Sequence, residues 1–128
     1  MARMEPLFVA SKMGRTEVVK VLLAAPGIDV NRADKYGNTP LHWASVQGRT
    51  EVVKVLLAAP GINVNGAEKG GRTPLYAASW KGHSEVVKLL LGAPGVDVNQ
   101  ADLDGNTPLT KAKNDKIRVL LRAAGATE

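Results

Sequence analysis

The 128-residue sequence contains no cysteine, few aromatic residues and no long apolar run. The absence of cysteine excludes disulfide bonds and thiolate metal sites, and it is typical of proteins from a reducing compartment. Because no apolar run is long enough, we expect neither a secretory signal nor a membrane-spanning helix. The sequence therefore predicts an intracellular protein, cytoplasmic or nuclear, that has no membrane partner.

Residue patterns that signal catalysis are also missing. The two histidines, His42 and His83, do not form a metal-binding pair, and the sequence has no glycine-rich phosphate loop and no Gly-x-Ser-x-Gly motif. Asp102 and Asp104 resemble part of a calcium loop, but Gly105 follows too early and no glutamate closes the loop. We therefore predict that the protein is not an enzyme and has no catalytic, metal or cofactor site.

What the sequence does contain is an internal repeat. The segment Gly48–Asn65 occurs almost unchanged as Gly14–Asn31, with Asp29 in place of Asn63, and more loosely as Gly82–Asn99. A Thr-Pro-Leu motif recurs in the same register, and successive copies are 34 residues apart. A fixed period of this size indicates stacked supersecondary units. The near-identity of the copies indicates either recent duplication or a designed, consensus-like sequence.

Each unit begins with a turn and a short helix. In the second unit, Asp34 and Gly37 are typical turn residues. Thr39 is a good N-cap, and Pro40 suits the first helical position because its missing N–H would have no partner there. Gly48 is expected to end this helix.

A second helix follows, with Thr50 as its expected N-cap. Apart from a narrow stripe of Glu51, Lys54 and Ala58, this helix is apolar around its circumference. A surface helix normally buries one stripe only, so this one must lie between neighbouring units. Residues 62–65 then alternate apolar and polar side chains, as a short extended segment does.

These motifs resemble the ankyrin repeat. Thr-Pro-Leu-His, the small residues after it, Val-Val-Lys-x-Leu-Leu and a closing Asp-Val-Asn are shared with that family. The resemblance implies an all-α solenoid of stacked helix-turn-helix units with β-hairpin-like loops. We expect a single domain, 1–128, with repeats at about 4–31 (partial), 32–65, 66–99 and 100–128 (a C-terminal cap).

The sequence departs from the family pattern in two places. One extra residue falls in each Ala-Pro-Gly turn, and the family's histidine is kept only at His42. Phe8, Tyr76 and Thr110 replace it in the other units. The side-chain hydrogen bonds that the histidine makes in the family are therefore expected at His42 alone.

The resemblance also implies a function: a non-enzymatic scaffold that binds a partner protein through a concave face of hairpin tips and first helices. Trp80 stands out on this face, since tryptophan, tyrosine and arginine dominate binding hot spots. Two interpretations of Trp80 stay open: it is a binding residue, or it packs on the helix of a neighbouring unit. Carried over by position, the expected contact residues are Arg32, Lys35, Tyr36, Asn38, Gln47, Lys69, Arg72, Trp80, Lys81, Leu103 and Asn114.

Two other interpretations stay open. A consensus-like chain could be a structural repeat module with no specific partner. The net charge of +5 also raises the alternative of an acidic or nucleic-acid ligand. Nucleic acid is the less favoured of these, because Lys20, Lys54 and Lys88 each follow a glutamate by three residues. Finally, the first unit has no polar outer helix, so we expect weak end-to-end self-association.

Overall fold

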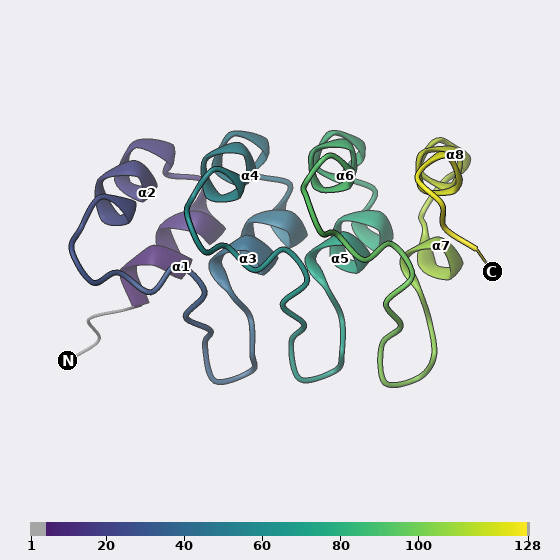
Figure 1. Ribbon diagram of the computed structural model, residues 1–128, viewed down its shortest axis with the longest axis horizontal. Helices are drawn as coiled ribbons and strands as arrows, with labels where there is room; N and C mark the ends of the chain where they lie inside the picture. The colour runs from purple at the N-terminus through teal and green to yellow at the C-terminus, as the bar shows by residue number, and fades with distance from the viewer. Residues whose placement is uncertain (1–4, 128) are drawn as a thin grey trace.

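The computed structural model describes residues 5–127, which form eight helices and no strands. The helices lie in two parallel rows, and the chain alternates between the rows from the N-terminus to the C-terminus (Figure 1). The first helices of the units are α1 (Glu5–Met13), α3 (Pro40–Gln47), α5 (Pro74–Lys81) and α7 (Pro108–Lys111). The second helices are α2 (Thr16–Leu23), α4 (Thr50–Leu57), α6 (Ser84–Leu91) and α8 (Asp115–Ala123). The predicted all-α solenoid is confirmed.

The first helices begin and end as their sequence predicts. The Thr39 hydroxyl accepts a hydrogen bond from the backbone N–H of His42 at 3.1 Å, and Thr73 caps α5 in the same way. Proline follows each cap. Gly48 ends α3 in the left-handed conformation, with φ of 69°, which costs glycine no steric strain.

The predicted cap of the second helix is wrong by one residue. Arg49 is the N-cap residue of α4, no side chain caps that helix, and Thr50 is its first residue. The chain leaves Gly48 in a tight turn in which the Thr50 N–H donates to the Gly48 carbonyl at 3.0 Å. That turn places Thr50 inside the helix, where its side chain cannot reach the free N–H groups of the first turn.

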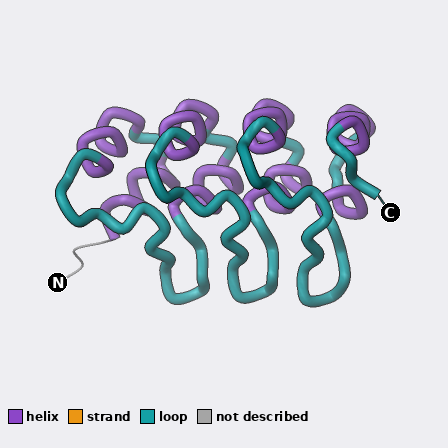
Figure 2. Tube along the Cα trace, viewed as in Figure 1, coloured by secondary structure: helices purple, strands orange, loops and turns teal. Residues whose placement is uncertain are grey.

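Three long loops connect the units and project beyond the row of first helices (Figure 2). Each loop closes on itself: the N–H of Asp34 donates to the Asn38 carbonyl at 3.0 Å, and the later loops repeat this bond. Neighbouring loops are also joined, because the Lys69 N–H donates to the Tyr36 carbonyl and the Leu103 N–H to the Gly70 carbonyl, both at 3.0 Å. These bonds give the loops the hairpin-like character that the sequence predicts.

The core is a continuous band of leucine and valine between the two rows of helices. Its largest fully buried side chains are Leu7, Leu41, Leu56, Leu75, Leu90, Ile117, Leu121, Val19, Val52, Val53, Val86 and Val87. The helix α4 buries Val52 and Val53 on adjacent sides and leaves Glu51 and Lys54 exposed. The prediction that the second helices lie between neighbouring units is therefore confirmed.

Asparagine side chains link successive units. The Asn31 amide donates to the Gly61 carbonyl and accepts from the Asn63 N–H, both at 2.8 Å. Asn65 makes the same two bonds one unit later, to Gly95 and Asp97. Each asparagine side chain thereby fixes the position of the next unit by bonding to that unit's backbone.

The two ends of the stack differ in polarity. Val18 is 46% exposed, whereas Val52, the equivalent residue of the second unit, is 1% exposed because the first unit covers it. Val21, one turn along α2, is 71% exposed. At the other end, α8 contains Arg118 and Arg122 among its hydrophobic residues. The repeat boundaries themselves stay a prediction, and the expected start near residue 4 lies outside the described residues.

Candidate functional site

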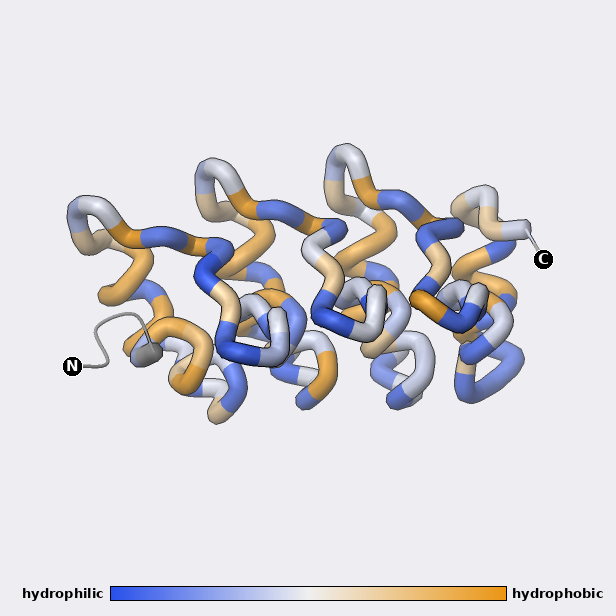
Figure 3. The backbone as a smooth tube through the Cα atoms, turned by 90° about the horizontal axis from the view of Figure 1, so that it is seen from below, coloured by the Kyte–Doolittle hydropathy of each residue, from blue (hydrophilic) through white to orange (hydrophobic). Residues whose placement is uncertain are grey.

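The candidate site is the surface formed by the three loops, 32–38, 66–72 and 100–106, and by the exposed sides of α3, α5 and α7, which we call the loop face. Seen from the loop side, its loops are mostly hydrophilic, whereas the connecting segments before them alternate hydrophobic and hydrophilic residues (Figure 3). Trp43 joins the two parts of this face. Its indole N–H donates to the Asp34 carboxylate at 3.0 Å, which ties α3 to its own loop.

An acidic residue organises the base of every loop. The Asp34 carboxylate accepts hydrogen bonds from the N–H groups of Tyr36 and Asn38, both at 2.9 Å. Burial alone would raise the pKa of Asp34, but hydrogen bonds from Asn38, Trp43 and Tyr36 outweigh it and hold the pKa below its usual value. This carboxylate therefore stays ionised and is used in building the loop.

The second and third loops repeat this arrangement with different partners. Glu68 accepts from the Arg72 N–H at 2.9 Å and also pairs with the Arg72 guanidinium at 3.5 Å. Asp102 accepts from the N–H groups of Asp104 and Asn106, both at 2.9 Å. Burial raises the pKa of Asp102, and these hydrogen bonds lower it by more, so its pKa also lies below the usual value.

Tyr76 lies beneath the last two loops and connects them. Its side chain interacts with Asp102 and Arg72, and it is almost fully buried. Burial and the interaction with Asp102 raise the pKa of the Tyr76 phenol, while Arg72 acts in the opposite direction. The interaction with Tyr76 raises the pKa of Arg72. Arg72 is thus exposed at the surface but held in place by Tyr76 and Glu68.

Three large apolar side chains remain exposed on the loop face. Tyr36 is 59%, Trp80 49% and Leu103 78% exposed. A lysine lies over each of the two rings. The Lys35 Nζ is 5.2 Å from the centre of the Tyr36 ring, and the Lys81 Nζ is 4.7 Å from the centre of the Trp80 ring. This pairing of an exposed ring with an ammonium group gives the face both apolar and cationic contact points.

The other predicted contact residues divide into exposed and structural ones. Arg32, Gln47 and Lys69 are exposed. Asn38 is half-buried and donates its backbone N–H and side-chain amide to Asp34. Asn114 is exposed, but it caps α8 by accepting from the Ile117 N–H at 3.0 Å. Binding through these residues stays a prediction, and the structure assigns the two asparagines a role in the fold.

His42 does not make the full set of expected hydrogen bonds. The residue is 5% exposed and its Nδ1 is buried with no hydrogen-bond partner. Burial lowers the pKa of His42. The carboxylates of Glu68 and Asp34 raise it by a smaller amount, so the net shift is downward. The expectation of a side-chain-to-backbone bond is therefore wrong for Nδ1, which is buried without an acceptor or donor of the described residues in hydrogen-bond reach.

The lowered pKa of His42 predicts a pH-dependent stability. The folded-state pKa lies below the unfolded value of about 6.5, so the unfolded chain binds the proton more readily. His42 therefore contributes its full stabilisation of the fold above about pH 6.5. This stabilisation is lost as the pH falls from the unfolded-state pKa toward the folded-state pKa. We expect the urea midpoint to fall between about pH 7 and pH 5, and to fall less in His42→Phe.

The control for this prediction uses the repeat itself, since Phe8 occupies the same slot in the first unit. The measurement must stay above about pH 5, because Asp34 and Asp102 have lowered pKa values and lose their stabilising effect in a more acidic window. An equal loss of stability in wild type and His42→Phe over the stated range would contradict the assignment.

Some contacts of this region were not predicted from the sequence. Lys12 lies over the Trp43 ring, with Nζ 4.4 Å from its centre, so α1 contacts α3 through a cation and a ring. The Arg49 side chain donates to the Lys12 carbonyl at 2.9 Å, and the His83 ring bonds the Val46 carbonyl at 2.9 Å. The sequence contains one signal for the last two contacts: Arg49 and His83 occupy the same position in successive repeats, 34 residues apart.

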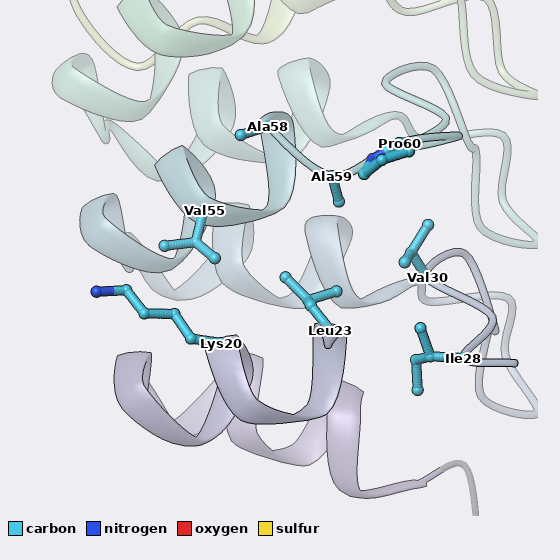
Figure 4. A pocket seen from close by; sticks show the side chains of 8 residues that line it. All are labelled: Lys20, Leu23, Ile28, Val30, Val55, Ala58, Ala59 and Pro60. Atoms are coloured by element: carbon cyan, nitrogen blue, oxygen red, sulfur yellow. The ribbon is translucent and has the colours of Figure 1, made fainter. Parts of the chain in front are cut away.

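Two grooves lie on the opposite side, between the second helices. One has a volume of 390 Å³, and its apolar side chains face each other across the gap while Lys20 points away from them (Figure 4). It is lined by Lys20, Leu23, Ile28, Val30, Val55, Ala58, Ala59 and Pro60. A groove of 460 Å³ occurs one unit later, between α4 and α6. Because the groove recurs with the stacking, we attribute it to the spacing of the helices and not to a ligand.

Within residues 5–127, no group of three or more histidine and acidic side chains is placed to hold a metal ion. In the same part of the chain, none of the helices has the length and apolar character needed to cross a bilayer.

Comparison with known proteins gives the family. No curated protein matches the sequence. Two family models do match: one described as ankyrin repeats (3 copies) over residues 2–68, and one described as ankyrin repeats (many copies) over residues 61–112. Together with the paired helices, the capping threonines and the projecting loops, these matches show that the chain belongs to the ankyrin repeat family.

Proposed function

We propose that the protein is a non-enzymatic scaffold that binds another protein through its loop face. Ankyrin repeats are generally protein–protein interaction modules, which supports this proposal. We further propose an intracellular location, cytoplasmic or nuclear, because the sequence has no cysteine.

The observation that carries the proposal is the exposure of Trp80. The equivalent residues in the first two units are Lys12 and Val46, so the repeat does not require tryptophan at this position. Trp80 also lies three residues after Ala77, the counterpart of Trp43, and therefore on the side of α5 that adjoins the loops. A large exposed ring on a rigid helix is a typical binding anchor.

The loops and helices around this anchor are held by hydrogen bonds in every unit, so little ordering is needed when a partner binds. Tyr36 and Arg72 extend the same surface into the neighbouring loops. Aromatic and arginine side chains of this kind contribute most of the binding energy in protein interfaces, and the contacts around them contribute little.

Replacing Trp80 with alanine should weaken binding of a protein partner by about 2 kcal/mol or more while changing the melting temperature little. The matched control is Lys54→Ala, which changes an exposed residue of α4 on the other side and should alter neither property. Binding isotherms and thermal melts on both variants make the measurement. If Trp80→Ala mainly lowers the melting temperature, the ring belongs to the core and the site is elsewhere.

The alternative is a designed or consensus-like repeat module without a specific partner. It differs from the scaffold in a measurable way, because capture of proteins from a lysate by the wild-type chain and by Trp80→Ala would then be identical. Selective loss of a captured protein with Trp80→Ala supports the scaffold.

The exposed valines of α2 support weak end-to-end self-association. Two copies would pair their N-terminal ends, because the residues at the C-terminal end include Arg118 and Arg122. We expect light scattering to show a concentration-dependent rise in mass that Val21→Glu abolishes. Val119→Glu, at a residue of the last helix that is 64% exposed, is the control and should leave the rise intact. A constant monomer mass up to millimolar concentration would contradict the idea.

A further inference from the structure

Positive charge is distributed unequally between the two sides of the molecule. On the second helices, Lys20, Lys54 and Lys88 each pair with the glutamate three residues earlier, at 3.1, 3.0 and 3.1 Å. Those pairs are mutually compensated and exposed to solvent. On the loop face, by contrast, Lys35, Lys69 and Lys81 form no ion pair with any carboxylate of residues 6–127.

The acidic residues of the loop face do not compensate these lysines, because they are used inside the loops. Asp34 accepts hydrogen bonds from backbone N–H groups and from Trp43, and Asp102 is buried. The Glu68 side chain is 15% exposed and pairs with Arg72. Asp104 is exposed, but it belongs to the last loop. The field of the first two loops and of α5 is therefore dominated by lysine.

The lysines are also placed beside apolar surface. Lys35 lies over Tyr36 and Lys81 over Trp80, so an ammonium group and a ring are presented together at two points of the face. Each ring restrains its lysine and leaves part of its own surface open to a partner. Such a surface matches a ligand in which carboxylates alternate with aromatic or aliphatic side chains.

We propose that the loop face binds an acidic polypeptide segment that carries aromatic or aliphatic residues among its carboxylates. This inference rests on the proposed function and adds the chemical class of the partner. A polypeptide fits better than a nucleic acid, because a lysine covers one face of each exposed ring and leaves only the other face on which a base could stack. Exposed Leu103 adds an apolar contact that a phosphate backbone would not use.

The test measures binding of a synthetic copolymer of glutamate and tyrosine by fluorescence anisotropy. A copolymer of glutamine and tyrosine, a single-stranded oligonucleotide and a DNA duplex serve as the other probes. The test variant is Lys35→Gln/Lys69→Gln/Lys81→Gln. Its matched control is Lys20→Gln/Lys54→Gln/Lys88→Gln, which removes the same number of positive charges from the second helices on the opposite side.

We expect the wild type to bind the acidic copolymer, with an affinity that falls as salt is raised. The loop-face variant should bind at least tenfold more weakly, and the second-helix variant should bind as the wild type does. Equal loss in both variants, no binding of the acidic copolymer, or tighter binding of an oligonucleotide would each overturn the inference.

Failure of this inference is distinguishable from failure of the proposed function. If Trp80→Ala weakens a captured protein partner but the loop-face lysine variant does not, the scaffold function holds and the acidic class is wrong. If the acidic copolymer requires the loop-face lysines, the class is supported even before a natural partner is identified.

Discussion

Replacing Leu56 with alanine should lower the free energy of unfolding by about 2–5 kcal/mol. The side chain is fully buried in the hydrophobic core between neighbouring units. Its removal forfeits the transfer free energy of the lost methyl groups and leaves a cavity that the stacked helices cannot fill by relaxing. Since each unit contacts only its neighbours, the lost contacts are those within the second unit and between it and the units on either side.

Leu22→Ala is the control, because Leu22 occupies the same position in the first unit and is only partly buried. We expect it to cost clearly less than Leu56→Ala, whereas Leu90→Ala, at the fully buried position of the third unit, should match Leu56→Ala. Chemical denaturation gives all three values. A result within a few tenths of a kcal/mol of wild type for Leu56→Ala or Leu90→Ala would contradict the assignment of the core.

Replacing Gly71 with alanine should also be strongly destabilising, by about 2–5 kcal/mol. Gly71 has φ of +84°, which strains any L side chain. An added Cβ would in addition lie 2.9 Å from the Leu103 nitrogen and 3.1 Å from the Asp102 Cα, both backbone atoms of the next loop. The two loops would have to separate, and the bond from Leu103 to Gly70 would be lost.

Gly105→Ala separates these two causes. Gly105 has the same φ of +84° at the equivalent place of the last loop, but nothing lies within 4 Å of an added Cβ. We expect this variant to show only the backbone strain, about 1–2 kcal/mol. Equal destabilisation of the two variants in urea titrations would mean that contact between loops contributes nothing measurable.

Much of the fold could be predicted because it depends on local signals that recur. Thr39, Pro40 and Gly48 specify where a short helix begins and ends, and each acts within its own turn of chain. The apolar character of α4 on nearly every side predicted that it lies between neighbours, and Val52, Val53 and Leu56 are buried there. The family resemblance rested on the same residues.

The details of the site were less predictable because they depend on contacts between units. Trp43 reaches Asp34 of its own loop and Lys12 of the preceding unit, and its counterparts in the other units are not tryptophan. The misplaced cap at Thr50 has a similar origin, since the turn through Gly48 decides which residue enters the helix first. Of the predicted contact residues, only their exposure and their hydrogen bonds follow from the structure.

The asparagine links described above have a consequence for how such a chain can change in length. Asn31 and Asn65 bond to backbone carbonyl and N–H groups of the following unit, and every residue except proline carries both groups whatever its side chain. Position 63 holds asparagine and position 97 aspartate, yet the backbone N–H of each donates the same hydrogen bond to the asparagine of the preceding unit. The side chains of a unit can therefore diverge, or a unit can be duplicated or deleted, and the asparagine of the preceding unit can still bond to the backbone atoms that set the spacing between units.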